Sequence, residues 1–295
     1  DPWLVGRLAR TMAQAFGHPP CVDLNEQQIS ASLLIAKDEA LQDCQNVAET
    51  AALLADAPEP ATDNWPFLYL KSPTIPGMYL AVLIMILVLS GLAVVFSGGG
   101  LSNSSRYIDL FLLGAAFMLL ETRAVTMFAL LFGTTWLVNA IVFAGILVAV
   151  LLAVEFTRWF NRISSTGRVP LPIAYAVLLA SLAAVWLVPP ASLLTLPTPV
   201  RLVVAVGLTF LPVFTANVIF ASRFNDSAQP TTAFGMNLLG AMVGGCLEYL
   251  ALLTGYQALI IIAGVLYIAA LLVESRYRRG KGSGDSAAVP ATASS

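Results

Sequence analysis

The stretch GAAFMLLETRAVTMFALLFG, residues 114–133, decides the class of fold. Nearly all of its residues are apolar, and its length matches the ~20 residues with which a helix crosses a bilayer. Glu121 and Arg123 stand near its middle, where a charged side chain costs about 2.5–3.5 kcal/mol on insertion scales. The stretch therefore predicts a transmembrane helix whose two charges meet polar partners inside a bundle.

The composition of the whole chain agrees with this prediction. Of its 295 residues, 58% are hydrophobic and only 11% are charged, whereas a soluble globular domain has about 25% charged residues. The mean hydropathy of +0.82 is typical of an integral membrane protein. A formal net charge of −2, without a basic patch interleaved with aromatic residues, argues against a nucleic-acid partner.

The apolar residues fall into segments of roughly bilayer length. They predict a mainly α fold, a polytopic membrane helix bundle of about seven transmembrane helices within residues 77–274. The expected spans are 77–97, 107–131, 135–157, 171–188, 199–221, 233–253 and 256–274. The Gly-rich residues 97–105 are expected to form an interhelical loop, because no Lys-Ser/Thr pair follows them as in a phosphate-binding loop. The small and polar residues 275–295 are expected to form a disordered tail.

Residues 1–57 differ from the apolar part and are expected to be the closing elements of an α/β sheet. The alternation of helix and strand patterns supports this interpretation, and the chain is expected to be the back end of a longer protein. The expected elements are helices over 1–17 and about 38–56, with strands over 21–24 and 31–36. Five prolines exclude a continuous helix over residues 58–76, which are expected to be a linker.

The basic residues predict the topology. With seven spans, the loops at 98–106, 158–170 and 222–232 share one side with the C-terminal tail, and that side carries nine Arg and Lys residues. They are Arg106, Arg158, Arg162, Arg168, Arg223, Arg276, Arg278, Arg279 and Lys281. The opposite side has only Lys71 and Arg201 near a membrane end. Because the positive side is normally cytoplasmic, residues 1–64 are expected to face outward; the alternative keeps them cytoplasmic and requires a miscounted or re-entrant span.

Two cysteines bear on the same choice. Cys21 and Cys44 lie in the polar segment, and in an oxidising compartment they could form a disulfide. The alternative is two unrelated thiols, because spacing alone does not show that the two residues approach each other.

Polar residues within the spans are the candidate functional residues. The candidates for an intramembrane network are Glu121, Arg123, Asn139, Asn217, Asn237 and Glu248. We expect Arg123 to meet Glu248, and Glu121 to be protonated or bonded to an Asn or Thr. The network would form either a polar pathway for a proton or cation, or a buried cluster that fixes helix packing. Gly240 and Gly244, with the adjacent Gly245, predict a close helix contact through their small-xxx-small spacing.

No catalytic or metal centre is predicted within this chain. The sequence has one histidine, and no His, Cys and carboxylate cluster has metal-ligand spacing. No nucleophile and base are paired in a recognisable pattern.

Four long stretches carry a family resemblance. They are WLVGRLARTMAQAFG, ATDNWPFLYL, FLLGAAFMLLETRAVTMFALLFGTTWLVNAIVFAG and NLLGAMVGGCLEYLALLTGYQAL. Together they resemble bacterial multi-span membrane proteins that are fused to a spermidine-synthase-like domain. In that family the soluble domain resembles Rossmann-like aminopropyltransferases and methyltransferases, with membrane helices before and after it.

The resemblance implies that residues 1–56 are the last elements of that domain. It places the glycine-rich nucleotide turn, and the acidic residues for decarboxylated S-adenosylmethionine, upstream of Asp1. No catalytic or cofactor-binding position is therefore assigned to this chain. It also implies a multi-pass protein of the bacterial cytoplasmic membrane, with the bilayer and the upstream soluble and membrane parts as partners.

Three functions are compatible with these observations. The first is the membrane-embedded portion of a spermidine-synthase-like protein. The second is a transporter-like module with an intramembrane polar pathway. The third is a scaffold or accessory subunit of a larger membrane complex.

Overall fold

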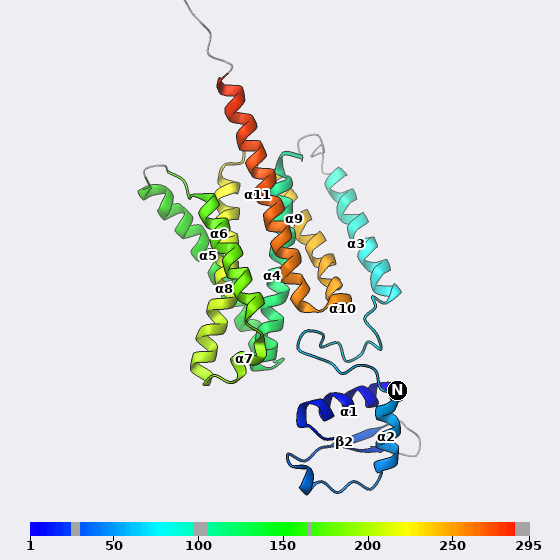
Figure 1. Cartoon of the computed structure of the whole chain (residues 1–295). Coiled ribbons are helices and arrows are strands. Elements are labelled where there is room, and N and C mark those ends of the chain that lie inside the picture. Colours follow the sequence, from blue (N-terminus) through cyan, green and yellow to red (C-terminus); the bar gives the residue numbers. More distant parts are fainter. Residues whose placement is uncertain (25–29, 97–104, 165–166, 287–295) are drawn as a thin grey trace, which may run out of the picture. The chain divides into compact units, whose positions relative to one another are not determined.

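The computed structural model describes residues 1–24, 30–96, 105–164 and 167–286, and its chain is mainly α (Figure 1). It divides into two compact units. The first comprises residues 1–75 with 251–255, and the second comprises the described residues of 76–250 and from 256 onward. The predicted loop at 97–105 lies outside the described residues except for Ser105, and so do residues 287–295.

The first unit contains two helices, a hairpin and two short helical turns. Its elements are α1 (Pro2–Phe16), β1 (Cys21–Leu24), β2 (Ala31–Leu34), η1 (Glu39–Leu41), α2 (Val47–Ala55) and α10 (Ala251–Thr254). Gly17 ends α1 in the left-handed conformation, with φ of 85°, and its N–H donates to the Ala13 carbonyl. β1 and β2 pair antiparallel, with Cys21 opposite Leu34. A two-stranded sheet does not by itself confirm a Rossmann-like remnant.

The helix expected over about 38–56 is broken, which corrects the prediction. Only η1 and α2 are helical, because residues between them are tied to the start of β1 and to the residues after β2. The Gln42 side chain accepts from the Ala36 N–H (3.0 Å) and donates to the Pro19 carbonyl (2.7 Å). Cys44 forms a disulfide with Cys21, with the Cα atoms 5.2 Å apart. These bonds hold the segment in a non-helical path.

Arg7 holds the proline-rich residues 58–76, which contain no helix, through hydrogen bonds from its side chain. Its side chain is 1% exposed. Its guanidinium donates to five backbone carbonyls, those of Glu59, Phe67, Leu68, Leu70 and Lys71. It also lies 5.2 Å from the centre of the Trp65 ring, within cation–π range. Burial lowers the pKa of Arg7, and the carbonyls compensate the buried positive charge.

The second unit is a bundle of helices. Its elements are α3 (Gly77–Phe96), α4 (Ile108–Phe132), α5 (Trp136–Ile163), α6 (Leu171–Leu187), α7 (Pro190–Leu194), α8 (Thr198–Asn225), α9 (Pro230–Leu247), η3 (Glu248–Leu250) and α11 (Tyr256–Ser286). Within the described residues, five helical segments are long and apolar enough to cross a membrane. They are Ser105–Phe132, Trp136–Ile163, Thr198–Asn225, Pro230–Thr254 and Tyr256–Arg276.

The expected count of seven spans is therefore not confirmed. Each expected span falls on a helix, but α6 (Leu171–Leu187) and the fully described part of α3 (Gly77–Ala93) are shorter than the other five. At 1.5 Å per residue, the 17 residues of α6 rise about 25 Å. A bilayer core is about 30 Å thick.

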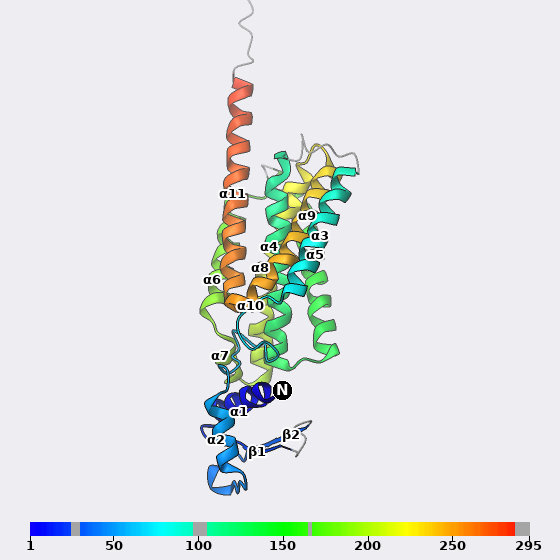
Figure 2. The same ribbon diagram turned by 90° about the vertical axis from the view of Figure 1, so that its right-hand side faces the viewer.

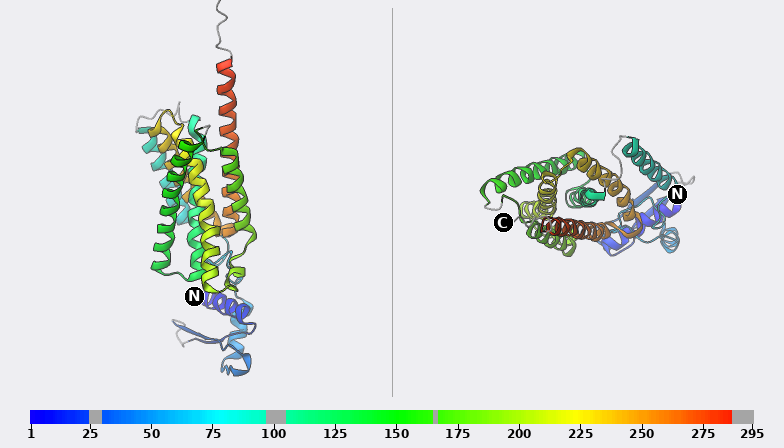
Figure 3. Two further views of the ribbon diagram at one scale, coloured as in Figure 1. Left: turned by 90° about the vertical axis from the view of Figure 1, so that its left-hand side faces the viewer. Right: turned by 90° about the horizontal axis from the view of Figure 1, so that it is seen from above.

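α4 lies at the centre of the bundle. It packs against α5, α8, α9 and α11, and the view along the bundle shows it enclosed by them (Figure 3, right). α3 lies against α9, on the outside of this group (Figure 2). Because α4 carries Asp109, Glu121 and Arg123, this arrangement brings charged residues into the interior of the bundle.

The contact between α4 and α9 is close because of glycine. A Cβ atom at Gly240 would overlap the Phe111 carbonyl, and one at Gly244 would come within 2.5 Å of the Ala115 carbonyl. On the other side of the contact, a Cβ at Gly114 would overlap the Asn237 backbone. A Cβ at Gly245 would meet nothing within 4 Å, so Gly245 does not take part in this contact.

The C-terminal end corrects a second prediction. α11 runs through Ser286, whereas the tail was expected to be disordered from residue 275. The helix thus extends beyond its apolar part, although this extension contains three glycines.

Candidate functional site

One polar contact lies between α4 and the end of α9. The Thr122 hydroxyl donates to a Glu248 carboxylate oxygen at 2.5 Å. The carboxyl group of Glu121 lies within electrostatic range of Glu248. Thr122 follows Glu121 directly, and η3 begins at Glu248 as α9 ends. Two acidic residues thus face the same region of the bundle, one of them held by a hydroxyl group.

The expected pair between Arg123 and Glu248 is not formed. No described carboxylate lies within ion-pair distance of Arg123. The reason is helix geometry: each residue turns the α-helix by about 100°, so Arg123 faces away from the neighbour that Thr122 contacts. It points instead toward α6, α8 and α11, whose Leu182, Thr209 and Ile260 lie beside it.

The remaining candidates do not join this cluster. Asn237 donates to the Leu110 carbonyl at 3.0 Å and so links α9 to α4. Asn217 donates to the Val213 carbonyl of its own helix at 2.8 Å. Asn139 is exposed in the first turn of α5. The six residues therefore occupy several places in the bundle and do not form one network.

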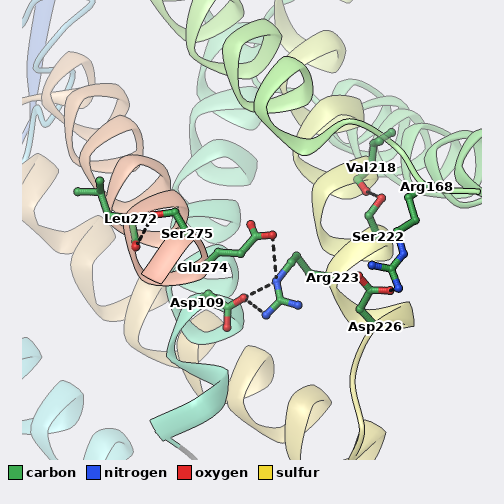
Figure 4. Close-up of polar contacts among 9 residues, drawn as sticks. All are labelled: Asp109, Arg168, Val218, Ser222, Arg223, Asp226, Leu272, Glu274 and Ser275. Atoms are coloured by element: carbon green, nitrogen blue, oxygen red, sulfur yellow. Dashed lines mark hydrogen bonds and ion pairs between the residues drawn. The ribbon is translucent and has the colours of Figure 1, made fainter. Parts of the chain in front are cut away.

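A second polar cluster lies at one end of the bundle and was not predicted (Figure 4). Arg223 of α8 bonds Asp109 of α4 through two nitrogens, with Nε 2.7 Å and Nη2 2.5 Å from Oδ2. Its Nε also lies 3.6 Å from a carboxylate oxygen of Glu274 in α11. Asp109 is 0% exposed and Glu274 is 3% exposed. The Arg223 guanidinium thus links α8 to α4 and α11 through contacts with oppositely charged carboxylates.

A sequence signal for this cluster exists. Asp109 stands at the beginning of one span, whereas Arg223 and Glu274 stand at the ends of two others. The expected topology places these three ends on the same side of the membrane. The charge pattern alone predicts Arg223 as a basic loop residue and does not show which carboxylates it meets.

An open basin adjoins this cluster. Its volume is about 1130 Å³. It is lined by Ser105, Arg106, Tyr107, Ile108, Arg168, Arg223, Asn225, Asp226, Ser227, Ala228, Val273, Glu274 and Arg276. Arg168 lies 3.7 Å from Asp226 within it, and the Gln229 N–H donates to the Tyr107 hydroxyl at 3.0 Å. Basic residues from four segments of the chain therefore converge on one hollow.

Comparison of the chain with protein-family models, curated proteins and solved structures gives no match. Within the described ranges, no group of three or more His, Cys, Asp and Glu side chains could hold a metal ion. The groups that the bundle brings together are carboxylates, guanidinium groups and hydroxyls. Such groups can bind ions and protons and can fix helices to one another.

Proposed function

We propose that this chain is the membrane-embedded portion of a spermidine-synthase-like membrane protein. In this proposal the helical bundle anchors the protein in the bilayer, and residues 1–57 complete a soluble α/β domain. The positions for catalysis and for an S-adenosylmethionine-type cosubstrate lie outside this chain. Four resembling stretches and the five apolar helices of bilayer length support the proposal.

The unpaired edges of the β1–β2 sheet are the observation that most supports assigning residues 1–57 to a larger soluble domain. In the described part of the first unit each strand pairs with the other, so each leaves one edge unpaired. Two-stranded hairpins are marginally stable alone, and an open edge is a template for a further strand. A larger sheet in the same protein would satisfy both edges and would explain why such a short hairpin occurs between α1 and α2 in the sequence.

The whole protein provides the test. Two protease sites, one in the linker at residue 72 and one between the soluble domain and the upstream membrane helices that the resemblance implies, are cleaved in membranes that contain the full-length protein. We expect a folded soluble fragment to be released that carries residues 1–57 and binds decarboxylated S-adenosylmethionine in calorimetry. A fragment that stays in the membrane pellet would overturn the anchoring role, whereas a released fragment without nucleoside binding would overturn the synthase-like assignment.

The polar residues along α4 favour a transporter-like module as a second candidate. Asp109 adjoins the basin, and Glu121 follows it by about 18 Å along the helix at 1.5 Å per residue. If they form a pathway, proteoliposomes of the full-length protein should show a proton or cation flux that Glu248→Gln reduces at least tenfold. Absence of flux would leave the packing role of these residues, as in the scaffold hypothesis.

A further inference from the structure

Arg123 is a buried cation without a protein counter-charge in the described residues. Its side chain is 5% exposed. Its Nε has no hydrogen-bond partner among the residues that the structure describes, and no described carboxylate lies within 4.0 Å. Tyr256, which hydrogen-bonds Thr126, is the titratable group within electrostatic range of the guanidinium. A neutral phenol does not balance its charge.

A small cavity lies beside this guanidinium. Its volume is about 20 Å³, which exceeds the ~10–15 Å³ that one water molecule occupies on the same measure. The lining residues are Leu120, Arg123, Ala124, Met127, Leu182, Val185, Leu208, Thr209, Pro212 and Ile260. All except Arg123 and Thr209 are apolar, so the lining offers the buried charge little polar compensation.

Thr209 supplies a second donor at the cavity. It is 7% exposed, and its hydroxyl has no partner among the described residues. Pro212, three residues further along α8, lines the same cavity. A hydroxyl and a guanidinium from two packed helices, both able to donate hydrogen bonds, therefore line one small cavity.

We propose that this cavity binds a monovalent inorganic anion of halide size. An uncompensated charge in a low-dielectric interior is unfavourable, and an anion is the occupant that neutralises it. The cavity is too small for an organic ligand, and the positive charge of the Arg123 guanidinium that lines it disfavours a cation. A water molecule would fill the space without balancing the charge. The site is independent of the proposed anchoring function.

The test is a halide titration of the full chain in nonionic detergent. The protein is exchanged into sodium gluconate, and chloride or bromide then replaces gluconate at constant ionic strength. We expect the thermal unfolding midpoint to rise saturably, by about 5 °C when the halide is in hundredfold excess over its dissociation constant. Equilibrium binding of radioactive chloride should show one site per chain.

Matched variants distinguish the cavity from other halide effects. Thr209→Val and Arg123→Gln should each abolish the halide-dependent rise. Thr157→Val is the control, because Thr157 is equally buried but donates to the Ala153 carbonyl of its own helix at 2.8 Å. A midpoint that does not respond to halide, or a response that Thr209→Val retains, would overturn the proposal and leave a water-filled cavity.

Discussion

Arg223 stands near the end of α8, where its position suggests a solvated cation. In the folded chain it is bonded to Asp109, and it approaches Glu274 on a third helix. The neighbouring exposed pair of Arg158 and Glu155 is the opposite case, since both side chains are more than half exposed. Two arginines that look alike in the sequence therefore have different energetic roles.

Asp109→Asn tests the buried pair. Removing the Asp109 charge leaves Arg223 with only the more distant Glu274 carboxylate, so the free energy of unfolding should fall by up to about 3–5 kcal/mol. Glu155→Gln removes an exposed pair and should change it by less than about 1 kcal/mol. Reversible unfolding in mixed micelles measures both. Equal effects of the two substitutions would contradict a structural role for Asp109.

Arg7 gives a second prediction for a single residue. A lysine at position 7 has one compact charge and cannot reach five carbonyls spread over the linker, so Arg7→Lys should lower the free energy of unfolding by roughly 2 kcal/mol or more. Arg10→Lys is the control, because Arg10 donates through one nitrogen to the Ala57 carbonyl at 2.6 Å. Thermal unfolding of both variants measures the difference, and a larger loss for Arg10→Lys would contradict this account.

Among the elements, the contact of α4 with α9 is the closest one that glycine makes in the described chain. Side chains at Gly240 and Gly244 would enter the α4 backbone, which cannot move aside as a flexible side chain can. Helices within a bilayer gain much of their association energy from such packing. The orientation of α9 against α4 also brings Glu248 to Thr122.

Gly240→Ala and Gly245→Ala form a matched pair on one helix. The first should separate α9 from α4 and lower the free energy of unfolding by about 1–3 kcal/mol. In Gly245→Ala the added methyl group points into open space, so the free energy of unfolding should rise by up to about 1 kcal/mol because alanine has the higher helix propensity. Parallel unfolding measurements compare them. If both substitutions have the same effect, the close contact does not stabilise the bundle.

At the scale of the whole molecule, folding brings several of the basic residues together at one basin. Arg106, Arg168, Arg223 and Arg276 come from four segments, and all line the same basin. These are four of the nine basic residues expected on one side of the membrane. Under the positive-inside rule we therefore propose that the basin faces the cytoplasm and that Cys21 and Cys44 face outward.

Thiol labelling of intact cells tests this topology. The two cysteines form a disulfide, so a membrane-impermeant maleimide should label them only after treatment with an impermeant reductant. Cys44→Ser should free Cys21 and allow labelling without reduction. Cys246, within α9, should stay unlabelled in both experiments. Labelling that occurs only after the cells are opened would place residues 1–64 in the cytoplasm.

The sequence predicted more of the elements than of the contacts. α1 with its Gly17 end, both strands and the positions of the apolar helices follow from periodicity and turn residues. The helix over 38–56 could not be predicted correctly, because Gln42 and Cys44 are held by distant partners. The expected pair of Arg123 with Glu248 also depended on tertiary structure, namely on which helix each side of α4 faces. A one-residue step along α4 changes which helix a side chain faces.

The amino-acid sequence by itself determined that this chain is mainly helical, that several of its apolar helices have bilayer length and that its basic residues favour one side. These properties are sums over neighbouring residues, since hydropathy and helix propensity are local. Only the tertiary structure decided that Asp109 and Glu274 meet Arg223 and that Arg123 lies beside a cavity. Such pairings depend on the rotation and packing of whole helices, which no local pattern specifies.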